Sequence, residues 1–184
     1  MIIPLNIILS YPVHWGKYEV LRDFIQNFYD AVGFRNWNQA FHYDYNEQDI
    51  LTMWIENVQF SYEWLMHIGA STKTGASSEN AGYFGEGFKI ASLCATRDHG
   101  MNVKMSSGDW ELVVTHIEHK IETRSMQMLA YDVKPTEYQD RSILQLWPIT
   151  PAVYSLFQRS CSVRGCQPTP VAAFTRRRQK ETAP

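Results

Sequence analysis

The chain has few cysteines and no long hydrophobic run. Its three cysteines are odd in number and form no C-x-x-C pair, which favours a reduced, cytoplasmic setting. No run is long and apolar enough to span a membrane, so a membrane partner is not expected. The apolar residues 1–10 have neither a basic segment nor a small-residue cleavage site. This start therefore predicts a core strand rather than a signal peptide.

Composition and charge indicate one folded domain followed by a basic tail. The chain has 184 residues, of which 45% are hydrophobic and 14% aromatic, enough to form a sizeable core. The net charge of −2 gives no indication of a partner. From Arg159 onward, however, six basic residues accompany one acidic residue, so this end carries +5 and the rest −7. We predict a domain over 1–158 and a basic, disordered tail over 159–184. Short basic ends are commonly just solvated, so nucleic acid is not expected to bind this domain.

Three glycines precede an apolar segment at G-x-x-G-x-G spacing. They are Gly82, Gly85 and Gly87, and Lys89 follows them. Glycines at a helix start permit close approach of an anion to unpaired N–H groups, which the helix dipole also favours. A lysine in the first turn opposes that dipole, so a nearby anion would explain Lys89. Two interpretations remain open, namely a phosphate site and a structural turn.

An upstream amphipathic helix is predicted over residues 19–32. Its apolar residues recur with helical period and predict a core face. Asp23, Asn27 and Asp30 are spaced so that they lie along the opposite face. One interpretation is a solvated surface. The other is chemical, because a carboxylate can activate water and a carboxamide oxygen suits Mg²⁺.

Residues 23–31 resemble the N-box of the GHKL ATPases, which include gyrase, the ninety-kilodalton heat-shock chaperones, histidine kinases and MutL. In several branches this box reads acid-x-x-x-Asn-x-x-Asp-Ala, and the chain has Asp23, Asn27, Asp30 and Ala31 at those positions. The resemblance implies that Asp23 is the general base and that Asn27 ligates Mg²⁺. The usual acid is Glu, so Asp23 is a shorter substitute.

Residues 68–73 and 82–89 resemble the lid and glycine motif of the same family. The resemblance implies that Lys73 reaches the nucleotide from the lid. It also implies that the phosphates are held by the glycine motif, comprising Gly82, Gly85, Gly87, Phe88 and Lys89. The small and polar residues 74–81 suit a mobile lid; the alternative is a plain flexible loop.

The base-binding motifs depart from the family pattern. Glu56 stands about where the family has the Asp of Asp-x-Gly-x-Gly, and neither glycine is present. Glu56 is thus either an acceptor for the adenine amino group or a strand-end surface carboxylate. Ser142 stands where the family often has a Thr that helps to bind the base; alternatively it is an ordinary strand serine.

The remaining pattern predicts an α+β fold. We expect strands at 5–10, 41–45, 50–55, 101–105, 110–117, 121–133 and 143–147, a hairpin turn at 106–109, and helices at 61–68, 87–95 and 151–157. By resemblance this is a two-layer α/β sandwich of the Bergerat type, with a mixed sheet covered on one face by helices.

The predicted function is Mg²⁺-dependent ATP binding with slow ATP hydrolysis. The resemblance also implies a protein partner or a further domain downstream. Two alternatives remain open. One is a non-catalytic binding or scaffold module of the same fold, and the other is a fragment of a larger machine that is inert without its missing parts.

Overall fold

The computed structural model describes residues 1–33, 35–66 and 86–162, and these form an α+β fold. The strands are β1 (Ile2–Ile8), β2 (Phe41–Tyr45), β3 (Leu51–Glu56), β4 (Asn102–Ile121) and β5 (Arg124–Trp147). The helices are α1 (Lys17–Val32), α2 (Trp37–Ala40), α3 (Tyr62–Met66), α4 (Glu86–His99) and α5 (Pro151–Ser162).

The long strand β5 organises the sheet. Its first half pairs with β1, its second half pairs with β3, and β4 pairs with it along both halves. Strand β2 continues the sheet beyond β3. Every strand pair in the described residues is antiparallel, so the prediction of a mixed sheet is wrong. The sequence pattern could not settle strand direction, because direction depends on how distant segments meet.

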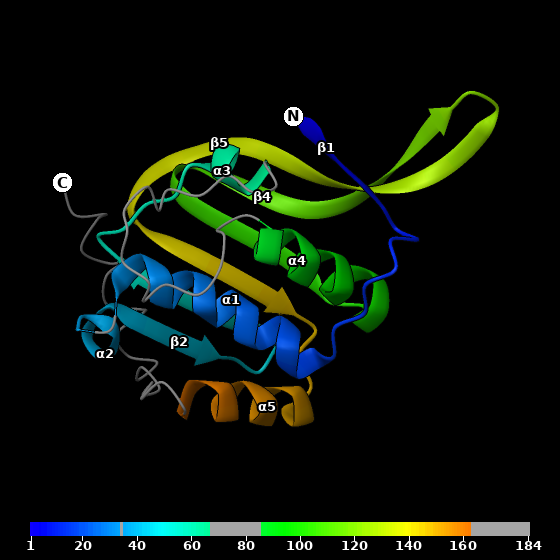
Figure 1. The fold of residues 1–184 in the computed structure, drawn as a ribbon. Helices are drawn as coiled ribbons and strands as arrows, with labels where there is room; N and C mark the ends of the chain where they lie inside the picture. The colour runs from blue at the N-terminus through cyan, green and yellow to red at the C-terminus, as the bar shows by residue number, and fades with distance from the viewer. Residues whose placement is uncertain (34, 67–85, 163–184) are drawn as a thin grey trace, which may run out of the picture.

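Helices α4, α1 and α5 lie side by side over one face of this sheet (Figure 1). The apolar face of α1 is buried, as its periodicity predicts: Val20, Leu21, Phe24, Ile25 and Phe28. Helix α5 packs on the β2 side, where the rings of Tyr43 and Phe157 meet edge to face at 4.9 Å. The core therefore lies between the helix layer and the sheet, and α1 is held between two neighbouring helices.

The second half of the chain forms two long strands where four short ones were expected. Residues 106–109 lie inside β4, so the predicted hairpin turn there is wrong. The register with β5 shifts at this point, and Gly108 adopts a φ of +58°. Glycine in this conformation is typical of a β-bulge, which bends a strand without reversing it. The chain reverses instead at residues 121–124, where Glu122 has a φ of +55°.

Two helices agree with their predicted positions but differ at their ends. Ser61 caps α3 as expected, since the Glu63 N–H donates to its Oγ at 3.3 Å. Helix α5 begins at Pro151 but continues past residue 157 to Ser162, with Ser160 and Cys161 buried. The helix thus crosses the predicted domain boundary at 158, because residues assigned to the tail by charge still supply core contacts.

Arg97 of α4 forms hydrogen bonds with the segment that precedes α1. Its guanidinium donates to the carbonyl oxygens of Leu9 at 2.8 Å and Tyr11 at 2.9 Å, and also to that of Val13. One turn earlier, the Cys94 Sγ accepts from the Trp15 N–H at 3.3 Å. These bonds fix the entry to α1 against α4, and so help to set how the two helices face each other.

Candidate functional site

The polar stripe of α1 is a half-buried cluster rather than a solvated surface. Asp23, Asn27 and Asp30 are all only partly exposed. The Asn27 Nδ2 donates to the Asp23 backbone oxygen at 2.9 Å and to the Asp23 Oδ2 at 3.3 Å. Asp30 accepts from the Gln26 Nε2 at 2.7 Å. The stripe is therefore an ordered set of hydrogen bonds on the side of α1 that faces its neighbours.

Asp23 lies directly against Gly87 in the first turn of α4. A Cβ placed on Gly87 would lie 2.6 Å from the Asp23 Oδ2, 2.8 Å from Oδ1 and 3.0 Å from Cγ. Contacts this short do not occur with a real side chain, so only glycine permits this approach. Two positions that are distant in sequence, residue 23 of α1 and residue 87 of α4, thus meet at this point.

Burial changes the acidity of Asp23. Removal from water raises the pKa of this carboxyl from 3.8 to about 6, while the hydrogen bond from Asn27 partly opposes the rise. Desolvation has this effect because it disfavours the charged form. A carboxylate with a pKa near 6 is still mostly ionised at pH 7, and it accepts a proton more readily than an ordinary aspartate.

Two oxygens of this pair accept no hydrogen bond from the residues that the structure describes. The Asn27 Nδ2 is the atom used in both bonds to Asp23, which leaves its Oδ1 without a partner among the described residues. The Oδ1 of Asp23 likewise has none. The described residues contain no group of three or more His, Cys, Asp or Glu placed to hold a metal ion. Mg²⁺ does not need such a group when it keeps several waters and takes phosphate oxygens.

Phe88 and Lys89 are interior residues of the α4 first turn. The Phe88 ring meets Phe24 edge to face at 5.5 Å and Tyr131 at 6.2 Å. Lys89 is fully buried. Their side chains therefore pack in the interior and do not face a ligand. Phe88 can still offer an anion its backbone N–H, because the first N–H groups of a helix have no intrahelical acceptor.

Glu56 and Ser142 lie on adjacent strands but on opposite faces of the sheet. Ser142 is opposite Ile55, and Glu56 is opposite Arg141. Side chains alternate along a strand, so Ser142 shares the helix-covered face with Ile55, whereas Glu56 points to the other face. The two residues therefore do not converge on one ligand from a single face.

Ser142 is engaged in a buried chain of hydrogen bonds. Its hydroxyl donates to the Val58 carbonyl oxygen at 2.7 Å, and its Oγ lies 2.8 Å from the Ser107 Oγ. The Phe60 N–H donates to the Ser107 Oγ at 2.8 Å. Since the Ser142 proton goes to Val58, Ser107 must donate to Ser142. This network holds the segment after β3 against β4 and β5.

Three predicted residues, Lys73, Gly82 and Gly85, lie outside the described residues, as does the lid at 74–81. Of the predicted site, the structure brings together Asp23, Asn27 and Gly87 with the α4 first turn.

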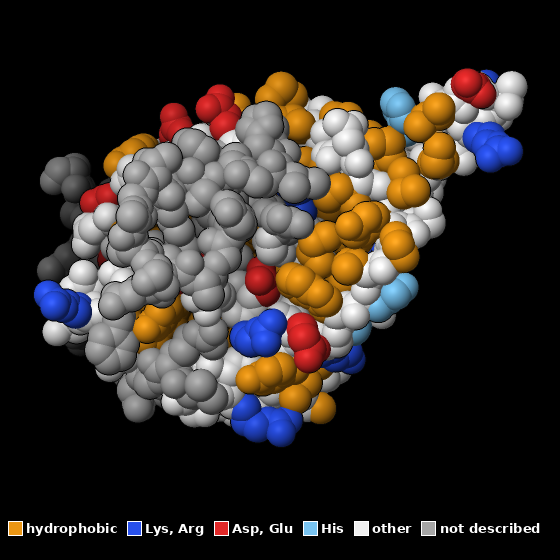
Figure 2. All heavy atoms as spheres, viewed as in Figure 1, with side chains coloured by type: hydrophobic (Ala, Val, Ile, Leu, Met, Phe, Trp, Pro, Cys, Tyr) orange, Lys and Arg blue, Asp and Glu red, His pale blue; other side chains and the backbone are white. Residues whose placement is uncertain are grey.

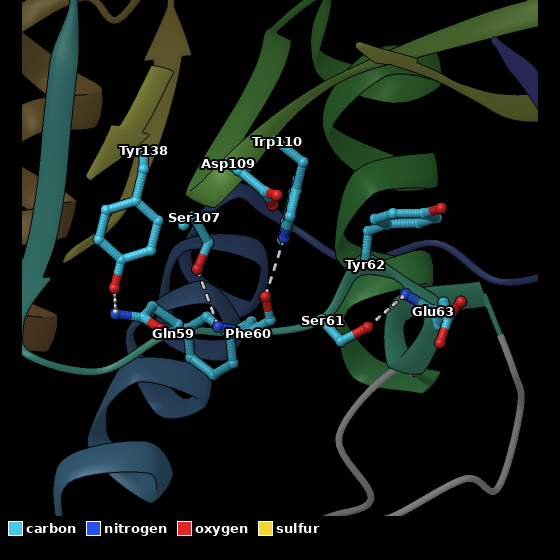
Figure 3. Close-up of a pocket in the computed structure, with 10 residues that line it drawn as sticks. Gln59, Phe60, Ser61, Tyr62, Glu63, Ser107, Asp109, Trp110 and Tyr138 are labelled. Carbon is cyan, nitrogen blue, oxygen red and sulfur yellow. Dashed lines mark hydrogen bonds between the residues drawn. The ribbon is translucent and has the colours of Figure 1, made fainter. Parts of the chain in front are cut away.

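A cleft of about 420 Å³ lies beside the same segment after β3, at the bulge of β4 (Figure 3). The Trp110 Nε1 donates to the Phe60 oxygen at 2.9 Å, and Gln59 donates to the Tyr138 hydroxyl at 2.8 Å across it. The sequence did not predict this cleft, because residues 106–109 were expected to form a turn that would end the strand before Trp110. The signal available was the aromatic pair Tyr62 and Trp110, whose rings meet at 5.8 Å.

Comparison with known proteins adds no family assignment. No protein-family model matches the sequence, and no curated protein matches it. Within the described part of the chain, no helix is long and apolar enough to cross a bilayer.

Proposed function

We propose that this protein is a GHKL-type domain that binds ATP with Mg²⁺ and hydrolyses it slowly. The observation that carries the proposal is the contact between the Asp23 carboxylate and Gly87. Phosphoryl transfer to water requires an acid that activates the water, and beside it a group that holds the phosphate. The second part here would be the start of a helix preceded by glycines. The Bergerat fold is part of the same proposal. It is supported by the helices over one face of the sheet, whereas the antiparallel pairing of the described strands departs from the mixed sheet that this fold implied.

The phosphate end of the proposed site is assigned to the first turn of α4. N–H groups at a helix start attract anions, and the absence of a Cβ at Gly87 leaves room beside them. Asn27 fits Mg²⁺ through its free Oδ1, because its amide nitrogen is already held by Asp23. When bound, Mg²⁺ would neutralise phosphate charge.

Asp23 takes the role of base in this proposal. Its Oδ1 is free to accept a proton from water, while Oδ2 is held by Asn27. Because burial raises the pKa of Asp23 to about 6, the base is lost as the pH falls below that value. We therefore expect hydrolysis to weaken on acidification through pH 6.

A second candidate is a non-catalytic module of the same fold. It is favoured by the base-binding region, where Glu56 and Ser142 lie on opposite faces and the Ser142 hydroxyl is already used. The two candidates differ in turnover. Both predict phosphate binding at α4, but only the first predicts that Asp23 is needed for hydrolysis.

The test is titration calorimetry of ATP with and without Mg²⁺, followed by a phosphate-release assay. For the wild type we expect binding that Mg²⁺ tightens. Asn27→Ala should remove that gain, whereas Gln26→Ala, which deletes a carboxamide from the same helix, should retain it. Asp23→Asn should bind but not hydrolyse. If folded wild-type protein shows no ATP binding, the ATPase and a nucleotide-binding module are both wrong, and a scaffold of the same fold replaces them. If it binds but releases no phosphate, the non-catalytic module replaces the ATPase.

A further inference from the structure

The tip of the β4–β5 hairpin projects from the body of the protein as a two-stranded arm (Figure 1). At its base, the His116 Nε2 lies 2.9 Å from the Thr96 Oγ1 of α4, and the Leu9 N–H donates to the Gln127 oxygen at 2.9 Å. Beyond these contacts, and among the described residues, residues 119–121 pair only with residues 124–126. A two-stranded ribbon on its own is marginally stable in water, so further pairing would stabilise this arm.

The outer edge of β4 is open along the arm. All backbone hydrogen bonds of β4 within the described part of the chain go to β5. Along residues 117–121, the printed side-chain bond is the one that Glu118 accepts from Ser125 of β5, so the backbone of the outer edge has no partner among the described residues. An open edge of this kind is a template for another strand. Proteins that avoid such pairing commonly place repelling charges on the edge, so the charges of the arm decide between protection and association.

The side chains of the arm are mixed in character. Ile121 is 48% exposed and Ile117 is half-buried. Between them stand Glu118, His119 and Lys120, all exposed. In the space-filling view, hydrophobic, acidic, basic and histidine side chains gather on this projecting part of the surface (Figure 2).

We propose that the arm is a self-association site, at which β4 of one copy pairs antiparallel with β4 of a second copy across a two-fold axis at His119. In this register Glu118 lies opposite Lys120 of the second copy, and Lys120 lies opposite its Glu118. Ile117 lies opposite Ile121, and His119 lies opposite itself. Cross-strand pairs of opposite charge and of β-branched apolar residues both stabilise a sheet.

Neighbouring registers are unfavourable. A continuous sheet requires paired residues to point to the same face, so the two-fold axis must pass through a residue position. Moving it to residue 118 places Glu118 opposite its own copy. Moving it to residue 120 places Lys120 opposite itself and Glu118 opposite Glu122. Like charges directly opposite destabilise a pair, so the arm's charges select the register at His119.

The interface is small, and the association is accordingly weak. Only residues 117–121 and their immediate neighbours overlap, whereas a standard interface involves about 20–30 residues on each side. We therefore expect a reversible dimer that forms as the protein concentration rises. It does not depend on nucleotide binding.

Analytical ultracentrifugation over a range of protein concentrations tests the proposal on the full chain. Lys120→Glu places Glu opposite Glu118 twice in each dimer, and we expect the dissociation constant to rise about tenfold or more. Glu118→Lys combined with Lys120→Glu restores opposite charges in the same register and should restore association. Lys17→Glu, the same charge change at the exposed start of α1, is the control and should have no effect. Circular dichroism checks that each variant is folded.

A crosslinking experiment tests the register itself. Residue 119 faces its own copy across the axis, so His119→Cys should form a disulfide-linked dimer on mild oxidation. Lys120→Cys, whose counterpart is Glu118, should not, and wild type gives the background from its own cysteines. A monomer at every concentration overturns the proposal. So does a dimer that is unaffected by Lys120→Glu, or one that crosslinks equally through residue 120.

Discussion

Replacing Asp23 with asparagine should make the protein more stable at neutral pH. The carboxyl of Asp23 is packed between α1 and Gly87, and this burial raises its pKa from 3.8 to about 6. The folded state therefore disfavours the charged form, which the unfolded chain accommodates freely in water. An asparagine has nearly the same shape and carries no charge, so it avoids this cost.

The magnitude follows from the difference in pKa. A difference of about two units at roughly 1.4 kcal/mol each gives about 3 kcal/mol as the upper limit. The sign is fixed by linkage. Because the folded pKa is raised, wild type has the full stability from this group below about pH 4, and it loses that stability as the pH rises through 6. Asn at this position does not titrate.

Urea unfolding of wild type and Asp23→Asn at several pH values measures this directly. We expect the variant to be more stable by about 1–3 kcal/mol at pH 7.5, with the difference declining to near zero at pH 4. Taking the difference between the two proteins removes the contribution of other titrating groups. A variant that is no more stable at pH 7.5, or an advantage that does not shrink on acidification, would refute the argument that Asp23 is held in a desolvating site.

Three further changes test the surroundings of the site. Gly87→Ala places a Cβ 2.6 Å from the Asp23 Oδ2, so thermal unfolding should show a loss of about 1–3 kcal/mol. Ser107→Ala leaves the Phe60 N–H without its acceptor, and urea unfolding should show a loss of about 1–3 kcal/mol. Asp98 is held by a neighbouring arginine, which lowers the pKa of its carboxyl to about 2. Asp98→Asn should therefore cost less than about 1 kcal/mol at pH 7, because solvent screens the pair, and the cost should vanish as the pH falls from 4 toward 2. A constant cost across this pH range would show that the ion pair is not its source.

The local spacing of apolar residues was sufficient to predict the elements that bury one face along their whole length. Strand β2 occupies the predicted residues 41–45, and α1 begins two positions before its predicted start at 19. In both elements, the apolar residues recur at the same spacing as the positions that face the core. The prediction of a turn at Gly108 was wrong. A glycine with positive φ occurs both in turns, which reverse the chain, and in bulges, which only bend it.

Part of the candidate site was likewise readable from spacing. Helical period placed Asp23 and Asn27 one turn apart, and the hydrogen bond between their side chains follows from that spacing. The positions of Glu56 and Ser142 show the limit. Glu56 is the last residue of β3, one position past its predicted end at 55, and Ser142 lies inside β5, where a strand was expected to begin only at 143. Their opposite faces depend on the register between β3 and β5, and a shift of that register by one residue would leave each strand's own pattern unchanged.

The sequence by itself determined the amphipathic helix α1, the segments that form β2 and β3, and the polar stripe through Asp23 and Asn27. These features depend only on residues a few positions apart in the sequence, because the regular geometry of a helix or strand fixes how such residues lie relative to one another. Only the tertiary structure decided that the stripe is half-buried, that Gly87 rather than another residue touches Asp23, and that the pKa of Asp23 rises. The reason is that burial and desolvation depend on which distant segments pack together, and packing is a property of the whole chain.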